Sequence, residues 1–180
     1  MRKFFLIGLV ISATACSISP EESNTPVSYY QKYFNDQIDS LMSGKYSVIR
    51  HTSEGEEVKQ ERLDSMDVER WSQELRGFIN ASYIDSNDTT HYQYALDRSG
   101  RFEIRRFTAK DTMAPLQRWE ETKVDGVIQL ITWETQKRSV LMDRRVEMTY
   151  QPLKGYRVRM KEDAAWSAPR DYEIFAEFIK

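Results

Sequence analysis

Few side chains in this sequence are suited to catalysis or metal binding. The chain contains two histidines, His51 and His91, and one cysteine, Cys16. A metal site usually combines three or four histidine, cysteine or carboxylate ligands, and each histidine here stands alone beside a threonine. No glycine-rich phosphate loop, nucleophile elbow or zinc-protease motif is present. We therefore expect a protein without metal or cofactor that is not an enzyme.

Adjacent carboxylates occur at three places, and a pair of carboxylates is the catalytic unit of most glycoside hydrolases. The pairs are Glu56-Glu57, Glu120-Glu121 and Glu162-Asp163. Neighbouring residues in a strand point to opposite faces of the sheet, so the two members of a pair do not converge on one substrate. Each pair also lies near a predicted turn, and we expect these acids to be exposed.

Basic residues gather in the last third of the chain. They are Lys137, Arg138, Arg144, Arg145, Arg157, Arg159 and Lys161. Such a cluster could bind phosphate or a sulfated glycan, but Glu147 and Glu162 lie among these residues. We favour the alternative in which opposite charges pair across neighbouring strands.

Aromatic residues are numerous, with four tryptophans, ten tyrosines and eight phenylalanines. Trp119 and Trp133 flank the turn signal Asp125-Gly126 and can face each other across a hairpin. The simplest interpretation is that the rings fill a core between helices and sheet. The alternative is a groove that holds an acyl chain or another apolar ligand. Its lining would come from Tyr30, Phe34, Trp71 and Phe78.

Two helices are predicted in the first half of the chain. Apolar residues recur at helical spacing from Val27 to Leu41 after the start signal Thr25-Pro26, which predicts a helix over 26–43. Asp67 can cap a second helix. The apolar face of that helix would be formed by Trp71, Leu75 and Phe78.

The rest of the sequence alternates with a period of two, as strands do. Residues 45–63 indicate a hairpin, and residues from 91 onward indicate about six further strands joined by turns. Because no helices separate these later strands, they cannot form a parallel sheet. We therefore predict an α+β fold in which two amphipathic helices pack on a curved antiparallel β-meander of about six strands, with an N-terminal hairpin at the sheet edge.

The first sixteen residues form a separate segment. Arg2 and Lys3 precede an apolar run over 4–11, and small residues at 13–15 lead to Cys16. This order resembles the signal peptide and lipobox of bacterial lipoproteins. The resemblance implies cleavage after residue 15, acylation of Cys16 and anchoring to the cell envelope, at the outer membrane of a Gram-negative bacterium. It covers the export segment only.

The expected domain organisation follows from this resemblance and from composition. Residues 1–15 would be the signal peptide, 16–26 a lipidated cysteine with a flexible tether, and 27–180 a single folded domain. The full chain has a net charge of −2, and loss of Arg2 and Lys3 makes it more negative. Nucleic acid is therefore not an expected partner, since the chain lacks the basic stripe that it requires.

A short triplet occurs four times: aspartate, then serine or threonine, then an aliphatic residue, methionine or threonine. It resembles the acceptor pattern of periplasmic O-glycosylation in some Gram-negative bacteria. Aspartate before serine or threonine is also a common capping and turn pair, and both interpretations stay open. The candidate acceptors are Ser40, Ser65, Thr89 and Thr112.

Two functions are compatible with these features. The first is a non-catalytic protein-binding or scaffold module that its lipid holds at the membrane, where it docks an envelope protein. The second is a carrier of an acyl chain or other apolar ligand between helices and sheet, like the lipoprotein-localisation factors. A cavity lined by the four groove residues would favour the carrier, and a filled core would favour the scaffold.

Overall fold

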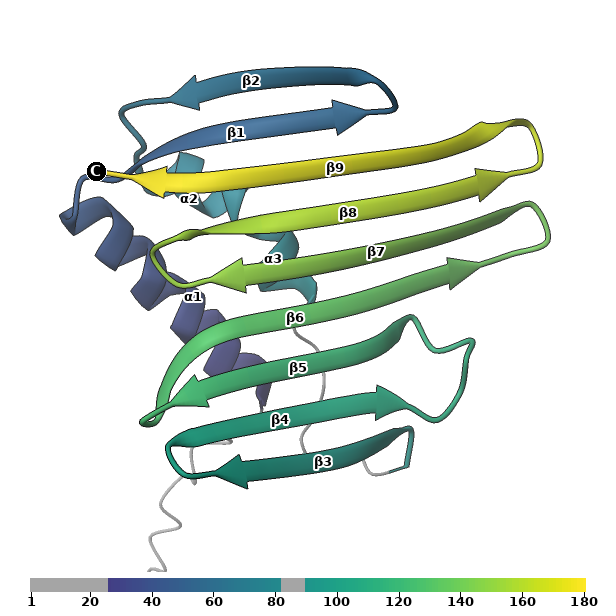
Figure 1. Cartoon of the computed structure of the whole chain (residues 1–180), viewed down its shortest axis with the longest axis horizontal. Coiled ribbons are helices and arrows are strands. Elements are labelled where there is room, and N and C mark those ends of the chain that lie inside the picture. Colours follow the sequence, from purple (N-terminus) through teal and green to yellow (C-terminus); the bar gives the residue numbers. More distant parts are fainter. Residues whose placement is uncertain (1–25, 82–89) are drawn as a thin grey trace, which may run out of the picture.

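In residues 26–81 and 90–180, the part of the chain that the computed structural model describes, nine strands form one antiparallel sheet and three helices lie on one of its faces (Figure 1). The helices are α1 (Pro26–Ser43), α2 (Val68–Glu74) and α3 (Arg76–Ala81). The strands are β1 (Ser47–Glu54), β2 (Glu57–Leu63), β3 (Tyr92–Ser99), β4 (Phe102–Ala109), β5 (Leu116–Val124), β6 (Val127–Arg138), β7 (Met142–Gln151), β8 (Gly155–Ala164) and β9 (Ser167–Ile179).

The strand order is β2-β1-β9-β8-β7-β6-β5-β4-β3. Strands that follow one another from β3 to β9 are neighbours in the sheet, and β1 pairs with β9 from Ser47–Ile179 to Glu54–Tyr172. The predicted fold class, two helices on a meander of about six strands with a hairpin at its edge, is therefore wrong. The whole of β1 pairs with the main chain of β9. The first hairpin is therefore part of a single open nine-stranded sheet.

The helical layer also differs from the prediction. α1 begins at Pro26 and ends at Ser43, as the spacing predicts. The second helix is interrupted at Leu75, which ends α2 with φ −92° and ψ 3°, and α3 follows directly. Asp67 caps α2 as predicted, because its carboxylate accepts a hydrogen bond from the Arg70 amide at 2.8 Å. The residues predicted for the apolar face, Trp71, Leu75 and Phe78, are all buried. The interruption therefore exposes none of them to solvent.

The core between the helices and the sheet is largely aromatic. The ring of Phe34 in α1 lies 6.2 Å from that of Trp133 in β6 and 5.1 Å from that of Tyr150 in β7. Trp119 and Trp133 are direct partners across β5 and β6, which confirms the predicted pairing. All of these side chains are buried, so side chains occupy the space between the two layers.

Tyrosine hydroxyls connect the helices to the sheet. The donor and acceptor pairs are Tyr30–Glu121, Tyr150–Gln37 and Tyr156–Glu74. Burial, followed by the nearby Glu74 carboxylate, raises the pKa of Tyr156 well above its ordinary value. Its hydroxyl therefore stays protonated at neutral pH and donates to the Glu74 carboxylate in α2.

Candidate functional site

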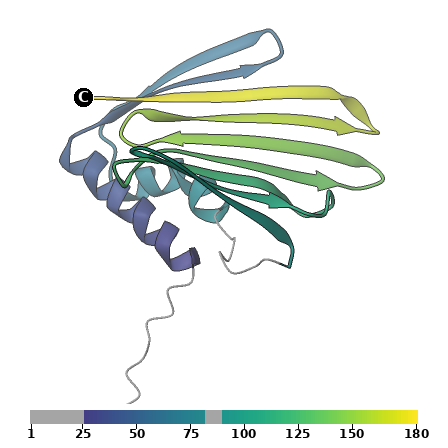
Figure 2. The same cartoon turned by 60° about the horizontal axis from the view of Figure 1, so that its bottom comes forward.

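The face of the sheet away from the helices, here called the open face, is covered by no helix or strand of residues 26–81 and 90–180 (Figure 2). Alternate residues of each strand point to it. On the three strands β7, β8 and β9 these residues are mostly charged or polar. They are Glu147, Thr149, Gln151, Arg157, Arg159, Glu173, Phe175 and Glu177.

Opposite charges pair across the strands of the open face. The Nε atoms of Arg157 and Arg159 lie 3.1 Å and 3.0 Å from the two carboxylate oxygens of Glu173. Arg145 lies 2.7 Å from Glu134 on the next pair of strands. The prediction of a charge ladder is thereby confirmed for these arginines. Each of these arginines has a glutamate partner, and Arg157 and Arg159 share one, so their positive charge is partly neutralised within the sheet.

Glu120 extends this ladder to β5. Its carboxylate accepts hydrogen bonds from Arg106 at 2.7 Å and from Arg118 at 2.8 Å. Burial acts to raise the pKa of Glu120, but these two hydrogen bonds outweigh burial and lower it. The Glu120 carboxylate is therefore charged at neutral pH, and its ion pairs with Arg106 and Arg118 are present there.

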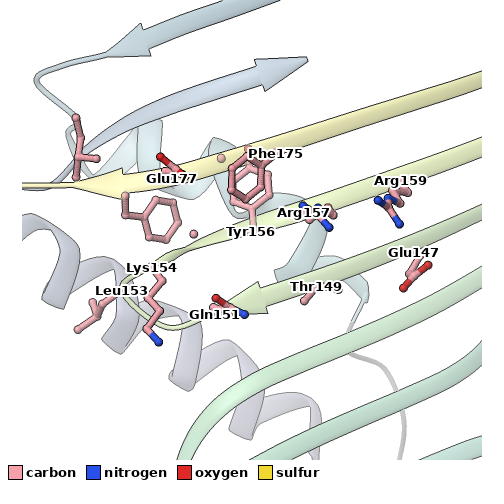
Figure 3. A pocket seen from close by; sticks show the side chains of 14 residues that line it. Glu147, Thr149, Gln151, Leu153, Lys154, Tyr156, Arg157, Arg159, Phe175 and Glu177 are labelled. Atoms are coloured by element: carbon pink, nitrogen blue, oxygen red, sulfur yellow. The ribbon is translucent and has the colours of Figure 1, made fainter. Parts of the chain in front are cut away.

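A depression of about 530 Å³ opens over the ends of β7, β8 and β9, beside the turn that joins β7 to β8 (Figure 3). Gly155 lies among its lining residues and contributes no side chain. Between its strand partners, Gln151 and Glu177, the lining is therefore main chain rather than side chain. Arg157 and Lys154 add positive charge to the rim, and Glu177 adds negative charge.

Two rings and a guanidinium stack beside the depression. The Phe175 ring lies between the His51 ring, with centroids 6.2 Å apart, and the Arg157 guanidinium, 5.3 Å from the ring centre. The cation is held over the ring face by the ring quadrupole. The lining combines charges of both signs, the amide of Gln151 and the aromatic residues Tyr156, Phe175 and Phe178. This mixture suits the surface of a polypeptide better than a polyanion.

Gly155 is required by the close approach of β8 to β9. Its φ of +149° is strained for other residues, and an added Cβ would lie 2.0 Å from the carbonyl oxygen of Ala176. We expect Gly155→Ala to lower the free energy of unfolding by about 2–4 kcal/mol. Urea denaturation measures this loss. Gly100→Ala is the matched control, because Gly100 also has a positive φ but open space around it, and we expect it to cost about 1 kcal/mol.

The four predicted groove residues lie on the other side of the sheet. Tyr30 is 8% exposed, Phe78 is 1% exposed, and Phe34 and Trp71 are fully buried. The structure brings Phe34 and Phe78 together, with ring centroids 6.2 Å apart, whereas Tyr30 packs on Trp119 and Trp71 packs on Phe178. All four side chains are part of the packed core.

The other candidate residues are dispersed. Ser40, Ser65 and Thr112 are exposed, and the Ser40 hydroxyl donates to the Asp36 carbonyl at 2.8 Å. Cys16 and Thr89 lie outside the described residues. Among the residues that the structure describes, no group of three or more histidine, cysteine, aspartate or glutamate side chains could hold a metal ion.

Glu121 is the residue that the sequence prediction missed. It was expected to be exposed, but it is fully buried on the helix side of β5. Its carboxylate accepts a hydrogen bond from Tyr30 at 2.8 Å and lies 3.0 Å from the Lys123 ammonium. Strand alternation places Glu121 on the same face as the buried Trp119, and that alternation was the available signal.

These features define a domain with one open antiparallel sheet, helices on one face and a charge-paired surface on the other. No family model matches the chain, and no curated protein is detectably similar to it. Within the described ranges, no helix is both long and apolar enough to cross a membrane.

Proposed function

We propose that this protein is a lipid-anchored, non-catalytic module of a bacterial cell envelope, attached through Cys16 and binding another envelope protein. The filled core supports a binding module rather than a carrier, because a carrier needs space for its ligand between helices and sheet. The residues that would line a groove between helices and sheet are at most 8% exposed. The open face is then the surface that remains for a partner.

The charge pattern supports a protein partner. Arg157 and Arg159 share the Glu173 carboxylate and Arg145 pairs with Glu134, each within about 3 Å. This partial neutralisation weakens long-range attraction to a polyanion. A partner surface with charges of both signs can match the alternating charges of the open face. One side chain of the partner can enter the depression beside Gly155. Specificity for the partner then comes from how its charges align with those of the open face, rather than from the net charge of either protein.

Acylation of Cys16 has a direct test. Cells grown with isotope-labelled palmitate should transfer label to the protein, and Cys16→Ala should abolish the labelling. Ser17→Ala is the matched control and should keep it, because it leaves the thiol in place. The mass of the N-terminal peptide then identifies the added lipid. Equal labelling of the Cys16→Ala protein would contradict the anchor.

Partner binding is tested by photo-cross-linking in intact cells. A photoreactive amino acid at position 151, on the rim of the depression, should give a discrete higher-mass product. The same amino acid at position 39, exposed on α1, should not. Native mass spectrometry tests the alternative, a carrier of an apolar ligand. We expect the mass of the protein alone, and an apolar molecule released on denaturation would favour the carrier.

A further inference from the structure

The β6–β7 turn and the β8–β9 turn lie side by side at the end of the sheet away from the helices (Figure 1). In the β6–β7 turn, Val140 is 100% exposed and Leu141 is 58% exposed. In the β8–β9 turn, Trp166 is 68% exposed. The Ala165 amide donates to the Leu141 carbonyl at 3.0 Å and joins the two turns. We call residues 137–142 and 164–170 together the tip surface.

Hydrogen bonds hold the β6–β7 turn in shape. The Ser139 amide donates to the Met142 carbonyl at 2.8 Å, and the Met142 amide donates to the Ser139 hydroxyl at 3.0 Å. Val140 and Leu141 therefore protrude on a structured turn. Apolar side chains that are exposed together usually mark an interaction site, since their burial removes apolar surface from water.

The chemistry of the tip surface fits a lipid bilayer. Its apolar residues stand on convex turns, where they can enter a soft interface without a complementary groove. Tryptophan is enriched at the membrane–water boundary because its ring is apolar and its N–H is polar. The tip segments contain the cations Lys137, Arg138 and Arg170. Three acids, Asp143, Asp163 and Asp171, directly adjoin these segments, and Asp143 lies 3.4 Å from Arg138.

The length of the chain before α1 allows contact with the same membrane. Tyr30 near the start of α1 packs on Trp119, whose strand partner is Trp133. Val140 lies seven residues beyond Trp133, which is about 23 Å along a strand. The ten residues from Cys16 to Thr25 can reach at most about 33–36 Å. An anchor on Cys16 and the tip surface can therefore touch one bilayer together.

We propose that the tip surface inserts Val140, Leu141 and Trp166 into the phospholipid surface to which the protein is anchored. This proposal takes the presence of that membrane from the proposed function. The insertion itself does not depend on the proposed function. Lipid anchor and tips together would make two attachment points. The sheet would then stand with its strands pointing toward the bilayer, and its open face would stay accessible from the side.

The test uses the chain without its acyl group, residues 17–180, which keeps every described residue. It is mixed with vesicles of phosphatidylethanolamine and phosphatidylglycerol whose acyl chains carry bromine, which quenches indoles that enter the bilayer. Trp71, Trp119 and Trp133 are at most 4% exposed, so Trp166 is the indole that can be quenched. We expect quenching in the parent protein and its loss in Trp166→Phe.

Vesicle co-sedimentation supplies the second readout. Val140→Asp combined with Leu141→Asp should weaken partitioning by roughly tenfold or more, because two apolar side chains are lost from the bilayer. Val58→Asp is the matched control, since Val58 is 70% exposed on edge strand β2, and it should bind like the parent. Absence of quenching, or equal partitioning of the tip variant, would overturn the proposal. So would concentration-dependent dimerisation that the tip variant abolishes, which would assign the surface to a second copy of the chain. Each result is independent of Cys16 acylation, which palmitate labelling decides separately.

Discussion

Replacement of Phe34 with alanine is expected to lower the free energy of unfolding by about 3–5 kcal/mol. The Phe34 side chain is fully buried, and its ring lies within 6.2 Å of the rings of Phe78, Trp133 and Tyr150. Its removal takes away apolar burial and leaves a cavity that these large, mutually packed rings cannot close. α1 would lose its central contact with the sheet.

Urea denaturation followed by tryptophan fluorescence measures this loss, because Trp133 is a direct neighbour. Phe102→Ala is the matched control at a 47% exposed position and should change the free energy of unfolding by less than about 1 kcal/mol. A Phe34→Ala protein as stable as this control would mean that the core can collapse around the missing ring. The space between helices and sheet would then be adaptable, as the carrier alternative requires.

Replacement of Lys123 with methionine should cost about 3–5 kcal/mol for an electrostatic reason. Glu121 is fully buried, and the Lys123 ammonium, 3.0 Å away, is its ion-pair partner. Methionine preserves much of the shape of the lysine stem but leaves a buried carboxylate without that cation. The hydrogen bond from Tyr30 and the more distant charge of Arg105, the strand partner of Glu121, remain. Neither replaces a direct ion pair to a buried carboxylate.

A second substitution distinguishes charge from packing. Adding Glu121→Gln to the Lys123→Met protein removes the buried charge and keeps an oxygen that can accept from Tyr30. We expect this double variant to recover more than half of the lost stability in the same urea experiment. If it is no more stable than Lys123→Met alone, the role of Lys123 is packing by its methylenes rather than charge.

Local signals in the sequence were sufficient for individual elements. The apolar spacing and the Thr25-Pro26 signal predicted α1 with its observed bounds, and Asp67 marked the start of α2. Strand alternation around Asp125-Gly126 placed Trp119 opposite Trp133. Each of these features depends on residues close together in the chain, where backbone preference and side-chain period act directly.

The arrangement of the elements was not predictable in the same way. No residue pattern in β1 specifies that its partner is β9, since pairing between distant strands depends on the whole sheet. The interruption at Leu75 carries no glycine or proline signal at that residue. The depression on the open face depends on Gly155 and on side chains of three strands, so it is visible only after their register is known.

The pairing of β1 with β9 has a consequence for the order of assembly. Ser47 and Ile179 are partners although they lie near opposite ends of the chain. Contacts so distant in sequence form late, because a long loop must be closed first. Synthesis delivers β1 well before β9, so the hairpin of β1 and β2 has no other neighbour in the sheet until β9 arrives. β9 thus decides when this hairpin becomes protected, and a chain cut short before β9 would leave the hairpin open to proteases and to foreign strands.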